Sequence, residues 1–171
     1  MCRAAGEVAD GFHIHPMHSP GYLRDVVHPA LAEGAAKAGR SVDDLTLYAP
    51  VFAISGESQA ETDAAAQEVR RQIAFYGSTP SYRRVLEYHG YEDLGQQLSA
   101  LMRRGDLAAM PALIPDALVE KIAVVSPPNE LARELKKRYD GVLHRVSLYF
   151  SIAGADDDDT WKRFIDDFRS A

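Results

Sequence analysis

Three apolar segments of the chain have the pattern of buried strands. Residues 12–15 alternate apolar side chains with histidines, and residues 142–150 form a second short apolar segment. Residues 45–54 are apolar on both faces, which is typical of a strand covered on both sides in a parallel sheet. Pro50 interrupts this segment and predicts a bulge, because proline has no N–H to give to the ladder.

Helices with one apolar stripe are predicted between these strands. Ser19 and Pro20 have the residue types of an N-cap and a first helical position, and an apolar stripe follows them to about residue 38. Pro29 lies inside this stripe and predicts that the helix is kinked or split there. Gly39 predicts the end of the helix, since glycine readily takes the left-handed conformation.

A second predicted helix leads into a region of short helices. Ser58 and Glu61 form a capping box, and the apolar positions that follow continue to about residue 76. Residues 82–122 contain several helical patterns and no strand pattern. We therefore expect a helical insertion at about residues 78–125, longer than an ordinary connection, and such insertions often cover or line a site.

Two more helices are predicted in the last third of the chain. Ser126 and Pro127 repeat the helix-start signal, and Gly141 closes that helix before the third strand. The last helix follows four acidic residues, 156–159, which suit a helix N-terminus better than a metal site. Its apolar stripe consists of Trp161, Phe164, Ile165 and Phe168.

The order of strand, helix, strand, helix with insertion, strand and helix predicts an α/β fold. Successive β-α units give parallel strands with right-handed crossovers. Three strands cannot close a barrel of the TIM (β/α)8 type, which needs about eight. We therefore expect residues 1–171 to form a single partial domain with about three parallel strands and covering helices.

The composition is that of a globular protein and argues against nucleic-acid and membrane partners. Hydrophobic residues make up 46% of the 171, the net charge is −6, and no run of Lys and Arg supplies a phosphate footprint. Cys2 is the single cysteine, so no internal disulfide forms, as in proteins of a reducing compartment. No apolar run approaches the ~20 residues of a membrane span, and a signal peptide is not evident. We expect a soluble cytoplasmic protein.

Five segments resemble one enzyme family. Residues 5–11, AGEVADG, resemble the AGE-[VI]-ADG motif of the bacterial luciferase-like flavin and deazaflavin oxidoreductases. The later segments agree in the same order, and they are SPGY at 19–22, APVF at 49–52, IAFYGSTPSY at 73–82 and RVSLY at 145–149. The similarity covers nearly the whole chain and is closest to the branch that uses the deazaflavin coenzyme F-420.

This resemblance implies the C-terminal portion of a TIM barrel. Residues 12–15, 45–54 and 142–150 would be about the sixth, seventh and eighth strands, with the active site at their carboxyl ends. The family's glycine-containing phosphate loop and its first strands have no counterpart in this sequence. No catalytic or cofactor-binding residue is therefore assigned, and we expect the isolated chain to be inactive.

Seven residues are candidates for lining a substrate pocket. Two histidines two positions apart share a face of their strand, and the other five candidates follow the capped helix before the insertion. The set is His13, His15, Tyr76, Ser78, Thr79, Tyr82 and Arg83. Each also has a structural interpretation, as a hydrogen-bonded imidazole, an exposed side chain, a turn residue or a packed ring.

Two further polar features have mainly structural interpretations. His13, His15 and His18 could suggest a metal, because two histidines two positions apart on a strand can hold zinc or iron, but no convincing third and fourth ligand is evident and we predict no metal. Arg145 lies in a predicted buried strand, where we expect an ion pair, with a phosphate or an acidic substrate as the alternative.

Three functions remain open from the sequence. The first is part of an oxidoreductase that transfers hydride between coenzyme F-420 or FMN and a small organic substrate, as the resemblance implies. The second is an FMN-dependent monooxygenase. The third is a non-catalytic fragment that pairs with an N-terminal half-barrel partner, or forms a homo-oligomer, through its exposed sheet edges.

Overall fold

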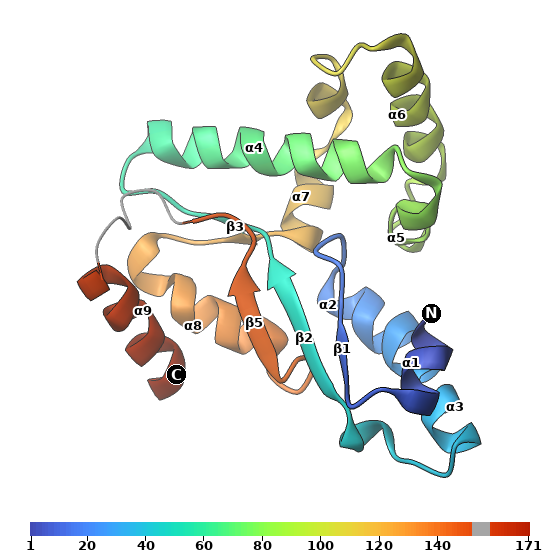
Figure 1. Ribbon diagram of the computed structural model, residues 1–171. Coiled ribbons are helices and arrows are strands. Elements are labelled where there is room, and N and C mark those ends of the chain that lie inside the picture. The colour runs from blue at the N-terminus through green and yellow to red at the C-terminus, as the bar shows by residue number, and fades with distance from the viewer. Residues whose placement is uncertain (152–157) are drawn as a thin grey trace.

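A small parallel sheet organises the chain (Figure 1). The computed structural model describes residues 1–151 and 158–171. Within these ranges the main sheet has the order β1-β2-β5, formed by Gly11–His13, Thr46–Val51 and Arg145–Leu148, and both pairings are parallel. A second parallel pair joins β3 (Ala53–Ile54) to β4 (Val124–Val125). The predicted parallel strands are confirmed, whereas β4 was not predicted.

The bulge expected at Pro50 is absent, and this prediction was wrong. Pro50 lies opposite Ser147 in a register that continues unbroken to Val51. Along the edge of β2 that faces β1, the N–H of Thr46 donates to Asp10, and the carbonyl of Tyr48 accepts from Ile14. The next N–H on that edge would belong to residue 50, so proline ends the pairing with β1 instead of distorting β2.

Strand β2 is covered on one face, although its sequence predicted burial on both. Leu47, Ala49 and Val51 are buried in a core that includes residues of the two covering helices, α3 and α8. On the opposite face Thr46 is exposed and Tyr48 is half-buried. This opposite face is called the open face, and it comprises His13, Tyr48, Pro50, Arg145 and Ser147.

Helix α1 (Cys2–Val8) crosses α3 (His28–Lys37) at two glycines (Figure 1). A Cβ atom on Gly6 would lie 2.1 Å from the carbonyl oxygen of Leu31, and one on Gly34 would lie 1.9 Å from that of Arg3. Glu7 accepts a hydrogen bond from Lys37 at 2.7 Å. The glycine of the AGEVADG motif therefore permits close helix packing, and its glutamate forms an ion pair with α3.

The helix predicted after Ser19 is interrupted, as Pro29 suggested. Ser19 Oγ accepts from the N–H of Tyr22 and caps α2 (Pro20–Tyr22). A π-helical turn, η1 (Leu23–Val27), then leads directly into α3. The wider turn lies just before Pro29, where the missing N–H would otherwise leave a gap in the α-helical hydrogen bonds. Gly39 follows α3 with φ of +71°, as predicted for a helix end.

Helix α4 (Gln59–Gly77) begins with the predicted capping box between Ser58 and Glu61. The insertion that follows is helical, as predicted, and packs with α4 around a second core (Figure 1). Its elements are η3 (Pro80–Tyr82), α5 (Arg83–Tyr88), α6 (Glu92–Arg104), η4 (Met110–Leu113) and α7 (Asp116–Ile122). A further short 3-10 turn, η2 (Val42–Asp44), precedes β2.

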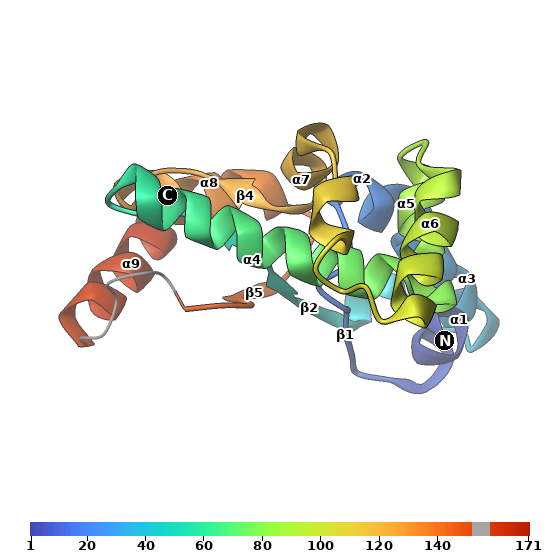
Figure 2. The same ribbon diagram turned by 90° about the horizontal axis from the view of Figure 1, so that it is seen from above.

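The last two helices differ from prediction at their starts. Helix α8 (Pro128–Tyr139) has Pro127 as its N-cap, so Ser126 does not cap it as expected. Helix α9 (Asp158–Ser170) packs on α8 through Phe164 and Phe168, whereas Ile165 of the predicted stripe is 44% exposed. Asp156 and Asp157 of the acidic run lie outside the described residues. Seen from above, α8 and α9 lie side by side (Figure 2). No helix in the described ranges is both long and apolar enough to cross a membrane.

Candidate functional site

Three of the seven candidate residues meet in one aromatic cluster beyond the carboxyl ends of β1 and β5. The ring of His15 stacks on Tyr82 with centroids 4.1 Å apart and meets the edge of Tyr76 at 4.4 Å. The hydroxyls of Tyr76 and Tyr149 are hydrogen-bonded at 2.6 Å. His15, Tyr76, Tyr82 and Tyr149 are called the tyrosine–histidine cluster. Carboxyl ends of parallel strands are where α/β folds place their sites.

The protonation state of His15 follows from its contacts. Its Nδ1 accepts a hydrogen bond from the N–H of Met17 at 3.1 Å, so the neutral ring carries its proton on Nε2. Burial, and then the nearby His13, lower the pKa of His15 below its ordinary value. At neutral pH His15 is therefore a neutral imidazole that offers an N–H donor.

Tyr76 is also held in its neutral form. Burial, followed by the hydrogen bond to Tyr149, raises the pKa of Tyr76 to about 12. Only one of the two hydroxyl protons is used in the Tyr76–Tyr149 hydrogen bond, so the pair retains one donor for another group. The cluster therefore offers ring faces and neutral donors, which suit the binding and orientation of a flat polar molecule.

The other four candidates lie outside this cluster. Ser78 is buried and donates to the carbonyl of Phe75 at 2.7 Å, and Arg83 donates to Ser99 Oγ at 2.8 Å. Thr79 is the half-buried N-cap residue of η3 and makes no side-chain capping bond. His13 is exposed on the open face with its ring 4.5 Å from that of Tyr48. The Ser78 side chain thus bonds the last turn of α4, and Arg83 links α5 to α6 within the insertion.

His18, the third histidine of the sequence pattern, is held inside the protein. His18 is 1% exposed, and its Nδ1–H donates to the carbonyl of His15 at 2.8 Å. Burial lowers the pKa of His18 to about 4.

Arg145 is exposed, and no ion pair among the described residues includes it, so the ion pair predicted for it is not found. Over the same described residues, no group of three or more His, Cys, Asp or Glu is placed to hold a metal.

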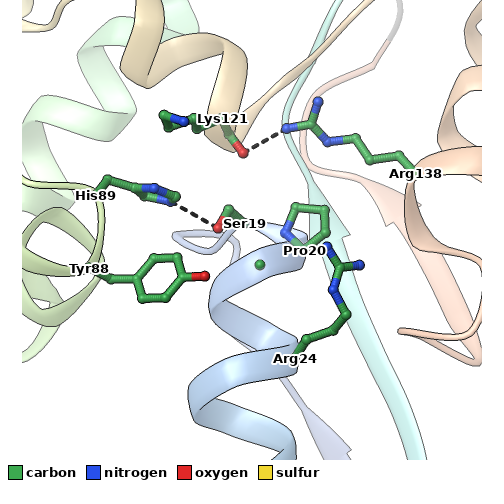
Figure 3. A pocket seen from close by; sticks show the side chains of 8 residues that line it. Ser19, Pro20, Arg24, Tyr88, His89, Lys121 and Arg138 are labelled. Carbon is green, nitrogen blue, oxygen red and sulfur yellow. Dashed lines mark hydrogen bonds between the residues drawn. The ribbon is translucent and has the colours of Figure 1, made fainter.

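A second site, which the sequence did not reveal, lies beside the start of α2 (Figure 3). It is a cavity of about 620 Å³ with side chains from four separate segments around it. We call it the basic pocket, and its lining residues are Ser19, Pro20, Gly21, Arg24, Tyr88, His89, Lys121 and Arg138. Two of its cations, Arg24 and Arg138, are 114 positions apart in the chain. No local sequence pattern could therefore have predicted the pocket.

The polar groups of the basic pocket are held in place by hydrogen bonds. Arg138 Nη2 donates to the carbonyls of Glu120 and Lys121 at 2.8 and 2.6 Å, at the end of α7. His89 Nε2 and Ser19 Oγ are 2.9 Å apart. Burial, and then the positive charge of Lys121, lower the pKa of His89.

Comparison with known protein families identifies one match. The family described as luciferase-like monooxygenase matches residues 1–145 of this chain. Proteins of Mycobacterium tuberculosis and Mycobacterium bovis, both described as uncharacterized, are 44% identical to it over 153 residues, which are 90% of this chain and 45% of theirs. The chain therefore spans less than half the length of these relatives.

Two comparisons concern a reductase of Methanopyrus kandleri. Its 5,10-methylenetetrahydromethanopterin reductase is 26% identical over 140 residues, which cover 80% of this chain and 38% of that protein. The solved structure of the coenzyme F-420-dependent tetrahydromethanopterin reductase from the same organism matches with a TM-score of 0.68 at 23% identity. This match covers 94% of the present chain and 44% of that one, and it shows the fold to be part of a luciferase-like TIM barrel.

Proposed function

The chain belongs to the luciferase-like monooxygenase family, and we propose that it is part of an oxidoreductase that transfers hydride between coenzyme F-420 and a small organic substrate. The observation that supports this proposal is the tyrosine–histidine cluster at the carboxyl ends of parallel strands. The similarity to a coenzyme F-420-dependent reductase favours the deazaflavin over FMN. An FMN-dependent monooxygenase is the alternative within the same family.

The residues of the cluster fit a flat, polar, ring-shaped group. His15 Nε2–H and the free tyrosine hydroxyl proton are donors for its ring oxygens or nitrogens, and the aromatic rings exclude water from one side. The deazaflavin, when bound, would supply the hydride chemistry. His15, Tyr76 and Tyr149 would bind and orient it, and the lowered pKa of His15 and the raised pKa of Tyr76 keep these two side chains neutral at pH 7.

A fluorescence titration of the purified chain with coenzyme F-420 and with FMN tests this proposal. It is run on the chain alone and on the chain co-expressed with the N-terminal part of the M. tuberculosis relative. Saturable binding of the deazaflavin supports the proposal, and binding of FMN alone favours the monooxygenase. If neither ligand binds in either preparation, the oxidoreductase assignment is overturned.

Substitutions at Tyr82 test whether the deazaflavin binds at the tyrosine–histidine cluster. Tyr82→Leu removes the ring that stacks on His15, whereas Tyr82→Phe keeps it. We expect Tyr82→Leu to weaken deazaflavin binding by roughly 5- to 10-fold, in the range of one aromatic contact, and Tyr82→Phe to bind as the parent does. Equal loss in both variants would mean that the hydroxyl, and not the stacked ring, is what matters.

A second proposal is that the chain acts only with a partner chain that completes its barrel. The open face exposes Arg145 and His13 and leaves Tyr48 half-buried, and β1 and β5 are the edge strands of the described sheet. The chain also spans less than half of the related proteins. Its mass in solution separates the outcomes: a stable 1:1 complex with the N-terminal part supports this proposal, and a homo-oligomer without binding contradicts it.

A further inference from the structure

The basic pocket concentrates positive charge in an acidic protein. Arg24, Lys121 and Arg138 line it, and none of its eight lining residues is acidic, although the chain has 25 Asp and Glu against 19 Lys and Arg. The salt bridges found among the described residues take none of these three cations. Like charges gathered without carboxylate partners repel one another, and a bound anion would relieve that repulsion.

The arrangement around the cavity suits an anion with several acceptor oxygens. Figure 3 shows Arg24 and Arg138 on one side of the cavity and Tyr88 and His89 on the other. Lys121 lies near enough to His89 to lower its pKa. One guanidinium group can donate two parallel hydrogen bonds to two oxygens of a phosphate, and an ammonium group adds a compact positive charge.

One carboxylate next to a pocket cation in the chain is already hydrogen-bonded. Asp25 follows Arg24 in the chain, and its Oδ2 accepts a hydrogen bond from the Tyr88 hydroxyl at 2.5 Å. That bond holds the carboxylate on the hydroxyl of Tyr88, which lines the pocket, whereas Asp25 itself is not one of the lining residues. Among the described residues no ion pair takes Arg24 or Lys121, so both remain available to a ligand, and Arg138 adds positive charge while its Nη2 bonds the end of α7.

We propose that the basic pocket binds the phosphate group of a small organic phosphomonoester. Three cations match a dianion better than a single carboxylate. The cavity of about 620 Å³ falls within the range of small-molecule sites and is much larger than the anion, so it leaves room for the organic part. This inference does not rest on the proposed cofactor, because the pocket and the tyrosine–histidine cluster share no lining residue.

The pocket and the cluster are nevertheless adjacent in the chain. His15 belongs to the cluster, Ser19 lines the pocket, and the loop between them is fixed by the hydrogen bond from His18 to His15. The inferred phosphate site and the proposed oxidoreductase site are therefore linked by one short loop.

The test uses isothermal titration of the full chain, without cofactor, with inorganic phosphate and with glycerol phosphate. Lys121→Gln and Arg24→Gln each remove one pocket cation, and Arg103→Gln, an exposed residue in the last turn of α6, makes the same change of net charge elsewhere. Arg138 is left intact because it bonds the end of α7. Thermal unfolding of each variant establishes that it is folded.

We expect glycerol phosphate to bind at least as tightly as inorganic phosphate. Each pocket variant should weaken binding by roughly 3- to 10-fold, and Arg103→Gln should leave it unchanged. The NMR signals of the His89 ring should move on titration, which locates the ligand. The proposal fails if neither compound binds, if only inorganic phosphate binds, or if Arg103→Gln weakens binding as much as the pocket variants do.

Discussion

Substitution of Gly6 by alanine tests the packing of the AGEVADG motif. The new Cβ would lie 2.1 Å from the carbonyl oxygen of Leu31 and 2.8 Å from the nitrogen of Ala35, where ordinary contact begins at 3.4 Å. Both atoms belong to the backbone of α3, so neither can rotate away, and α1 must move by roughly 1 Å. Overpacking of this kind costs up to about 3 kcal/mol, and alanine recovers about 1 kcal/mol of helix propensity. We expect a net loss of about 2 kcal/mol.

Gly21→Ala is the matched control for this prediction. A Cβ on Gly21 would meet the hydroxyl of Tyr88 at 2.8 Å, which is the far end of an exposed side chain and can move aside. Urea unfolding with an unchanged m-value should give a clear loss for Gly6→Ala and a change within about 0.5 kcal/mol for Gly21→Ala. The midpoint of thermal unfolding should fall by about 4–8 °C for Gly6→Ala only. Equal stability of the two variants would refute the packing argument.

Three further predictions concern stability. Tyr76→Phe removes the hydrogen bond to Tyr149 and should cost about 1 kcal/mol in urea unfolding, whereas no loss would show that the bond is not formed in solution. The unfolded chain protonates His18 near pH 6.5 but the folded chain only near pH 4, so stability present above pH 6.5 should fall by up to about 3 kcal/mol toward pH 4. His18→Gln should show a smaller fall between pH 7 and pH 4.5, and an unchanged fall would exclude His18 as its source. Ser58→Ala should cost about 1 kcal/mol by loss of the α4 cap, and Ser126→Ala, which removes no cap, is its control.

The sequence predicted helix ends best, because serine at an N-cap and glycine after a last turn each have one main structural role there. Ser19 and Ser58 cap helices as predicted, because each has an extended backbone that lets its hydroxyl accept a free N–H group of the first turn. Gly39 and Gly141 have φ of +71° and +66° at the ends of α3 and α8, where other residues would be strained. Ser126 failed as a cap because two prolines follow it, and the helix starts one residue later than the signal suggested.

The features that were missed depend on contacts between distant segments. Strand β4 has two residues and is identified only by its pairing with β3, more than sixty positions earlier. Three of the four residues of the tyrosine–histidine cluster, His15, Tyr76 and Tyr82, were candidates, but Tyr149 was not. The basic pocket was missed entirely, because its cations are single residues within otherwise ordinary amphipathic helices.

The burial of β2 on one face only, despite its apolar sequence, bears on the complete fold. Its sequence is apolar at nearly every position, yet the described residues bury Leu47, Ala49 and Val51 and leave Tyr48 and Pro50 half-buried. A strand that only had to be covered on one face would be expected to alternate apolar and polar side chains. In a closed barrel the second face of every strand is packed by side chains of the other strands. The composition of β2 is therefore that of a barrel strand, which supports the proposal that further strands cover the open face in the functional protein.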